Sequence, residues 1–142
     1  MFAYANIVPM KASSSAVLDV LPINVLTCDP KTLVIDYANR SSIETLNKLA
    51  HLLPRGVTGD NIVGQCIDVF HARPEHQRRL LADPRNLPHQ AIIRLGPELL
   101  DLYVDALWAG SKVKKLVLSW SVCTERERLK ICLLYTYDAA DE

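Results

Sequence analysis

The stretch from Phe70 to Leu95, FHARPEHQRRLLADPRNLPHQAIIRL, decides the fold because it changes from a helical to a strand pattern. Pro74 suits the first turn of a helix, where its missing N–H would have no partner in any case. Asp83-Pro84 and Leu87-Pro88 then end the helix, since a residue before proline is pushed towards extended backbone. From His89 onwards the residues alternate as in a strand. We therefore predict a helix over 74–81 followed by a strand over 89–95.

The residues before this stretch predict a hairpin and several short helices. Apolar runs over 23–28 and 33–39 flank a turn at Asp29-Pro30-Lys31, and Leu33, Ile35 and Tyr37 are expected to share one face of the second strand. Residues 41–53 carry an apolar stripe at helical spacing, with Ser41 and Glu44 forming a capping box. The pattern then predicts a short helix capped by Asp60 and a helical turn over 67–71. A short helix over 16–20 is expected before the hairpin, capped within 13–15.

The last third of the chain alternates with period two. Residues 99–108 place Leu100, Leu102, Val104, Ala106 and Trp108 on one face, and 113–124 form a long final strand with Trp120 on its apolar face. Thr124 and Glu127 again match a capping box, so a helix should leave the domain there. The predicted class is α+β, an antiparallel sheet with short helices on one face.

Composition excludes several functions. The chain has 142 residues with 49% hydrophobic content, which suits one domain with a substantial core. Its 16 basic and 16 acidic residues balance, so nothing favours nucleic acid or an anionic membrane. The four cysteines form no C-x-x-C pair, and no catalytic motif is found, so we do not expect an enzyme. With no signal peptide and no apolar run long enough to span a bilayer, we expect a cytoplasmic location without direct membrane insertion.

Four segments, LPINVLTCDPKTLVIDYAN, IVGQCIDVFHARPEHQRRLLADPRNLPH, AIIRLGPELLDL and LSWSVCTERERL, together resemble the PAS domains of bacterial methyl-accepting chemotaxis receptors. The resemblance covers roughly residues 17–129 and implies a PAS fold with a five-stranded sheet. One departure lies after Trp108, where AGSKVKK lacks a second glycine that the family pattern has in this hairpin. The resemblance implies a sensory domain that passes a change in its pocket or dimer to an output module through the helix from Thr124.

The expected organisation has four parts. Residues 1–15 are an N-terminal extension, 16–124 the PAS sensor domain and 125–131 the start of an outgoing signalling helix. Residues 132–142, CLLYTYDAADE, are similar to the translation of a sequencing adaptor, so we expect them to be an artefactual tail. The receptor's signalling domain would then be missing from this fragment, and a homodimer is the expected assembly.

Some PAS domains similar to this one hold a b-type haem between the sheet and the helices, bound by a histidine from the helical side. Imidazole suits iron, and an indole N–H can hydrogen-bond to a bound gas. By this resemblance His71 is the first candidate ligand of the iron, His76 the second, and Trp120 the distal donor. Flavin is disfavoured because no group is placed to bind its phosphate.

Each candidate also has an ordinary structural interpretation. His71 would hydrogen-bond to backbone at a turn, His76 would face solvent, and Trp120 would belong to the core. In that case the domain is a ligand-free module for dimerisation or protein interaction. The two hypotheses differ in one feature: a sensor needs a cavity beneath Trp120, whereas a module fills that space. The residues that would fill it are Leu80, Ile93, Leu102 and Leu118.

Overall fold

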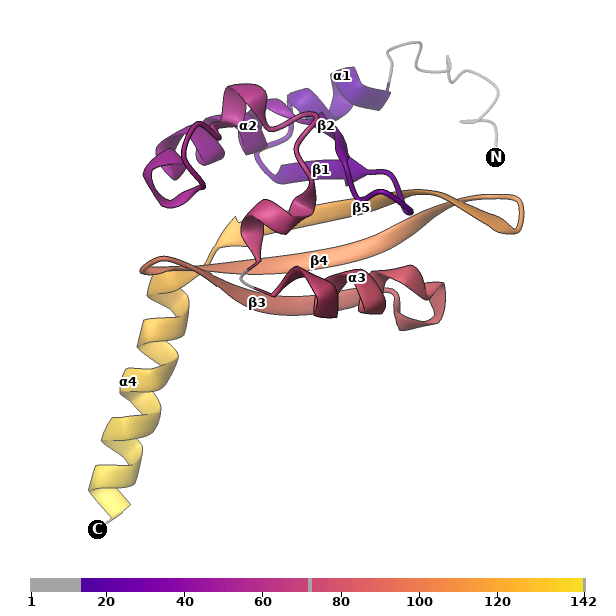
Figure 1. Ribbon diagram of the computed structural model, residues 1–142. Coiled ribbons are helices and arrows are strands. Elements are labelled where there is room, and N and C mark those ends of the chain that lie inside the picture. Colours follow the sequence, from indigo (N-terminus) through magenta and orange to yellow (C-terminus); the bar gives the residue numbers. More distant parts are fainter. Residues whose placement is uncertain (1–13, 72, 142) are drawn as a thin grey trace, which may run out of the picture.

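Five strands form one antiparallel sheet in the order β2-β1-β5-β4-β3 in the computed structural model (Figure 1). They are β1 (Asn24–Cys28), β2 (Ile35–Ala38), β3 (His89–Leu95), β4 (Glu98–Ala109) and β5 (Lys112–Val122). The structure describes residues 14–71 and 73–141, so the predicted extension lies largely outside it. The hairpin over β1 and β2 and the strand at His89 are confirmed, and the PAS fold with its five-stranded sheet is as expected.

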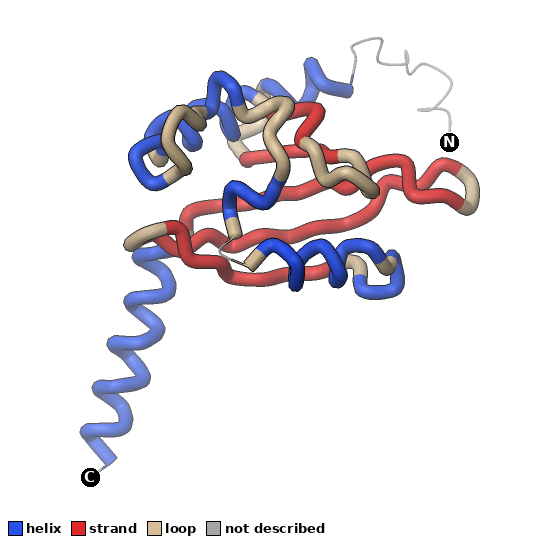
Figure 2. The backbone as a smooth tube through the Cα atoms, in the orientation of Figure 1, coloured by secondary structure: helices blue, strands red, loops and turns tan. Residues whose placement is uncertain are grey.

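Most of the helical elements are short (Figure 2). All of the described ones except α1 and α4 lie between β2 and β3 in the chain. They are α1 (Ser14–Asp19), α2 (Arg40–Lys48), η2 (Ala50–Leu52), η3 (Gly59–Asn61), η4 (Ile67–Phe70), α3 (Pro74–Ala82), η5 (Pro84–Asn86) and α4 (Thr124–Asp141). The helix predicted from Pro74 is therefore confirmed, and it ends one residue later than expected. α4 leaves from one end of the sheet, and the β4–β5 turn lies at the other end (Figure 1).

The core lies between one face of the sheet and the helical segment. Strand residues with period-two spacing meet apolar side chains from α2, η4 and α3, since each element buries only one face. These core residues include Leu26, Cys28, Leu100, Val104, Leu116, Leu118 and Trp120 from the sheet, and Leu46, Ile62, Ile67 and Leu81 from the helical side. Helices packed on this single face are what the α+β class requires.

The start of α2 differs from the prediction. The helix begins at Arg40 and is capped by Asn39, whose side chain accepts a hydrogen bond from the Ser42 backbone at 3.0 Å. It ends at Lys48, and the apolar stripe continues in the separate turn η2. Asn39 prevails over Ser41 because it is fully buried and its amide also donates to the Leu18 and Ile23 carbonyls. The proposed capping box at Ser41 is therefore wrong.

Two other expectations about the sheet fail. Tyr37 pairs with Thr27 whereas Ile35 pairs with Cys28, because the register shifts between Thr27 and Cys28. The extra residue in β2 reverses the alternation, so Tyr37 leaves the core face, and its hydroxyl donates to the Asp19 carboxylate at 2.9 Å. Trp108 was expected to be buried, but it is 51% exposed beside the β4–β5 turn, where it pairs with Val113.

Two predicted caps also act differently. The turn η3 is capped by Thr58, while Asp60 lies within the turn and accepts a hydrogen bond from the Asn47 amide. At α4 the Thr124 hydroxyl donates to the Glu98 carboxylate at 2.6 Å and accepts the Leu99 N–H at 2.9 Å. The start of α4 at Thr124 is confirmed, but the hydroxyl ties this helix to β4 instead of capping it.

Candidate functional site

His71 lies where η4 ends, in the connection to α3. Its backbone N–H donates to the Asp68 carbonyl at 3.1 Å, so the local turn fixes the position of the imidazole. The side chain is half-buried, and burial lowers the pKa of His71, while the nearby Asp68 carboxylate opposes this shift. A lowered pKa keeps the imidazole neutral at pH 7, the form that binds a metal.

An enclosed apolar cavity of about 20 Å³ lies between His71 and the sheet. It is lined by Leu26, Ile67, Phe70, His71, Ile93, Leu100, Leu102, Leu118 and Trp120. This volume is close to that of one water-sized probe, and the lining is almost entirely apolar. The space beneath Trp120 is therefore neither fully packed nor large enough, in this conformation, for a drug-sized ligand.

A second, open groove of about 680 Å³ lies on the outer side of the same segment. Its lining residues are Phe70, His71, Arg73, Glu75, His76, Gln77, Arg79, Ile93 and Arg94. Phe70, His71 and Ile93 line both spaces, so these three side chains separate the cavity from the groove. The groove is open to solvent and carries three guanidinium groups against one carboxylate.

Trp120 faces the cavity, and its N–H is already engaged. The indole nitrogen donates to the Ser42 hydroxyl at 2.9 Å in the buried interior. Ser42 itself is fully buried on α2, so this hydrogen bond joins the helical side to the centre of the sheet. The opposing pair at the cavity is thus a neutral imidazole on one wall and a bonded indole on the other.

The structure brings the three sequence-predicted residues together in part. His71 and Trp120 line the cavity, and His71 and His76 line the groove, but exposed His76 does not reach the cavity. Sequence reasoning missed Ser42 and Asp68. Ser42 directly follows Ser41, to which the sequence pattern assigned the cap, and no local spacing signals its bond to Trp120.

The described residues lack two features that would bear on function. Within 14–71 and 73–141, no cluster of three or more His, Cys, Asp or Glu side chains could hold a metal ion by itself. Over the same residues, no helix combines the length and apolar character that crossing a bilayer requires.

Comparison with known proteins gives one curated relative and several structures. The methyl-accepting chemotaxis protein McpB of Pseudomonas aeruginosa is 33% identical over 123 residues, which is 82% of this chain and 18% of the relative. The Aer2 receptor from Vibrio cholerae, described as a dual PAS-heme oxygen sensor, matches with a TM-score of 0.63 and 25% identity, covering 70% of this chain and 93% of that one. The PAS domain of BvgS from Bordetella pertussis matches in fold with a TM-score of 0.55 at 16% identity, covering 88% of this chain and 94% of that one. No model of a known protein family matches the chain.

The sheet order, the helices packed on one face and these structural neighbours define the class of protein: it is a PAS domain. More narrowly, the chain belongs with the PAS domains of methyl-accepting chemotaxis receptors. It spans less than a fifth, 18%, of the length of the curated relative that it matches.

Proposed function

We propose that this domain is the sensory unit of a chemotaxis receptor and that it binds a b-type haem, whose iron His71 would hold. The observation that carries the proposal is the position of His71. It is a half-buried imidazole with a lowered pKa, on the wall between an apolar cavity and an open groove. The Vibrio cholerae relative, a PAS-heme oxygen sensor by its description, supports the same ligand class.

The residues around His71 fit a haem in their chemistry. The apolar lining suits the macrocycle, and Arg73, Arg79 and Arg94 along the groove suit the two propionate carboxylates. The cavity alone, at about 20 Å³, is too small, whereas the groove of about 680 Å³ is within the usual range for ligand sites, roughly 300–1,000 Å³. Movement of Phe70 and Ile93 would join the two spaces. A bound haem would supply an iron that binds a diatomic gas or changes oxidation state.

Trp120 is the residue that would donate a hydrogen bond to a ligand in the cavity, but its N–H is bonded to Ser42. The N–H would have to leave the Ser42 hydroxyl before it could make that second bond. Ligand binding and the contact between the sheet and α2 would then compete for one donor. Such competition gives the ligand a differential affinity for two arrangements, which signalling requires.

Three polar contacts make α4 the proposed output element. Thr124 bonds to Glu98 and to the Leu99 N–H, and Arg126 pairs with the Asp101 carboxylate on β4 at 2.9 Å. Asp101 also accepts a hydrogen bond from Gln90 on β3, the strand that supplies Ile93 to the cavity wall. Displacement of β3 would therefore reach α4 through β4. The signalling domain that receives it would lie in the longer receptor, of which this chain is a part.

The second candidate function is a ligand-free dimerisation module. It is favoured by the small cavity volume and by exposed apolar residues on the sheet face opposite the helices. Ile92 is 47% exposed there and Tyr103 42%. A homodimer through this face is compatible with the sensor as well. The two functions differ in one prediction: a dimerisation module should show no saturable binding of a ligand.

Haemin titration followed by ultraviolet-visible spectroscopy tests the proposal. We expect a saturable Soret band that shifts with reduction and with carbon monoxide, and that is lost in His71→Ala. His76→Ala is the matched control, because His76 is an exposed histidine of the same segment and should retain the band. A flat visible spectrum, or a band that survives in His71→Ala, would remove the haem proposal and leave the dimerisation module.

A further inference from the structure

The two oxygens of the Asp68 carboxylate have different environments. Oδ2 accepts hydrogen bonds from Arg78, at 3.2 Å from Nε and 2.6 Å from Nη2. Oδ1 is buried and has no hydrogen-bond partner among the described residues. A buried carboxylate oxygen without a donor is costly, so it usually indicates a partner that arrives with a ligand or a change of conformation.

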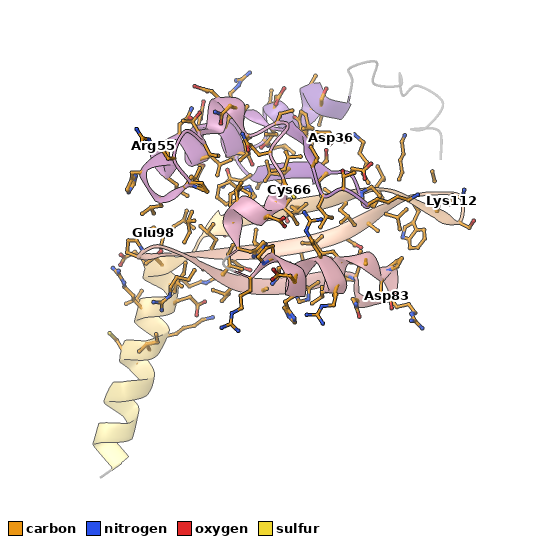
Figure 3. The ribbon with its side chains drawn as sticks, in the orientation of Figure 1. Asp36, Arg55, Cys66, Asp83, Glu98 and Lys112 are labelled. Carbon is orange, nitrogen blue, oxygen red and sulfur yellow. The ribbon has the colours of Figure 1, made fainter. Side chains whose placement is uncertain are left out.

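Asp68 is held in place by contacts that fix its rotamer. Arg78 on α3 binds Oδ2, and its Nη2 also donates to the Cys66 sulfur at 3.1 Å. The Arg78 guanidinium lowers the pKa of Asp68, with a smaller contribution from the Cys66 thiol, so the carboxylate is ionised at neutral pH. Cys66, labelled in Figure 3, is the residue before η4, and Asp68 lies in the first turn of η4.

His71 is a neighbouring ionisable group whose ring N–H could use the free oxygen. It lies one helical turn after Asp68, and its backbone N–H already bonds to the Asp68 carbonyl. The carboxylate is close enough for its charge to raise the pKa of His71 against the effect of burial. Among the described residues, no other side chain forms a hydrogen bond with the His71 imidazole that would compete with the carboxylate.

A histidine that binds a metal through one ring nitrogen commonly donates the N–H of the other to a carboxylate or carbonyl, which fixes its tautomer and orientation. We propose that Asp68 is the positioning residue of the haem site: its free Oδ1 accepts the N–H of the His71 ring nitrogen that does not bind iron. This inference rests on the proposed function, because it assigns a partner to the proposed iron ligand. Arg78 acts through Asp68 by holding the other oxygen.

Asp68→Asn provides the test, because the amide keeps the size of the side chain and removes its charge. In the haem-loaded protein the carboxylate gives the imidazole more anionic character, which favours ferric iron. We therefore expect Asp68→Asn to shift the iron midpoint potential to more positive values and to lower the iron–histidine stretching frequency in resonance Raman spectra. Asp68→Glu should restore part of both signals.

The matched control is Asp83→Asn, which also removes a carboxylate paired with an arginine. Asp83 pairs with Arg85 at 2.9 Å and lies at the far end of α3 (Figure 3). The Asp83→Asn variant should leave the iron midpoint potential and the Raman signal unchanged.

A second measurement uses the haem-free protein. Nitrogen NMR of the His71 ring should show one dominant tautomer in the wild type, and Asp68→Asn should change the ratio of the two tautomers.

The outcomes separate this inference from the proposed function. Haem that binds through His71 with an unchanged potential, Raman signal and tautomer in Asp68→Asn overturns the role of Asp68 and leaves the haem proposal standing. A wild-type chain that binds no haem overturns both. Equal shifts in Asp68→Asn and Asp83→Asn indicate a general charge effect and also overturn the positioning role.

Discussion

The indole N–H of Trp120 donates to the Ser42 hydroxyl at 2.9 Å, across the interior between β5 and α2. Both side chains are buried, so neither group can exchange this partner for water. The bond therefore couples the position of α2 to the wall of the cavity.

Ser42→Ala should destabilise the domain, because the Trp120 N–H is then buried without an acceptor. The expected loss in unfolding free energy is about 1–3 kcal/mol, measured by urea denaturation followed by circular dichroism. Ser121→Ala, at an exposed position of β5, should change stability by less than about 0.5 kcal/mol. Equal stability of Ser42→Ala and wild type would mean that the bond is not formed in solution.

Leu118→Ala should enlarge the cavity beneath Trp120. Leu118 is 4% exposed and lines the cavity, so its removal should cost about 2–5 kcal/mol of unfolding free energy. The enlarged cavity should also bind a small apolar probe such as benzene, detected as a rise in melting temperature. Ile92→Ala, on the exposed face of β3, is the control and should show neither effect. A rise in the melting temperature of Ile92→Ala with benzene would mean that benzene does not bind in the cavity beneath Trp120.

The stability of the domain should depend on pH through His71. Burial lowers the folded-state pKa of His71 below its unfolded value of about 6.5. The unfolded chain therefore binds more protons as pH falls through 6.5, and the stability present above that pH should decline between pH 6.5 and 5. Urea midpoints measured from pH 7.5 to 5 should show the decline, and His71→Gln should flatten it.

The control for the pH experiment is the exposed His51. His51→Gln should retain the decline, because His51 is exposed and lines neither the cavity nor the groove at His71. The carboxylates with lowered pKa, such as Asp29 and Asp83, lose their contribution at lower pH and do not obscure this window. If the urea midpoint of His71→Gln declines with falling pH as steeply as that of the wild type, another titrating group causes the decline.

Thr124→Val should loosen the connection between α4 and β4. The buried Thr124 hydroxyl bonds to Glu98, labelled near the start of α4 in Figure 3, and to the Leu99 N–H. Loss of both bonds should cost about 1–3 kcal/mol and speed amide hydrogen exchange in the first turn of α4. Glu125→Gln, at an exposed position of the same turn, should leave exchange unchanged. If amide exchange in Thr124→Val stays as slow as in the wild type, contacts other than those of Thr124 hold the first turn of α4 on β4.

The local patterns in the sequence were enough to predict much of the fold. Proline positions bounded the helix at Pro74 and the strand at His89, because proline restricts its own backbone and that of the residue before it. Period-two alternation predicted β4 and β5 as half-buried strands. The resemblance to chemotaxis-receptor PAS domains also rested on these segments. Each of these signals lies within a few residues along the chain.

The site itself required the tertiary structure. The sequence singled out His71 and Trp120 as residue types, but the sheet and helices place them on opposite walls of one cavity. Trp120 and Ser42 are 78 residues apart in sequence, and Arg78 reaches Asp68 from the next helix, so no local spacing predicts either contact.

Asn39 and Trp108 show the same division. Asn39 became the cap of α2 because two earlier segments, at Leu18 and at Ile23 to Val25, bring it their N–H and carbonyl groups. Trp108 is 51% exposed beside the β4–β5 turn, although its place in the alternation predicted a buried side chain. Sequence periodicity thus determined which elements form and which faces are apolar, because backbone preference and burial act locally. Hydrogen-bond partners, register shifts and cavity volume were decided by tertiary packing, because they depend on which distant segments meet.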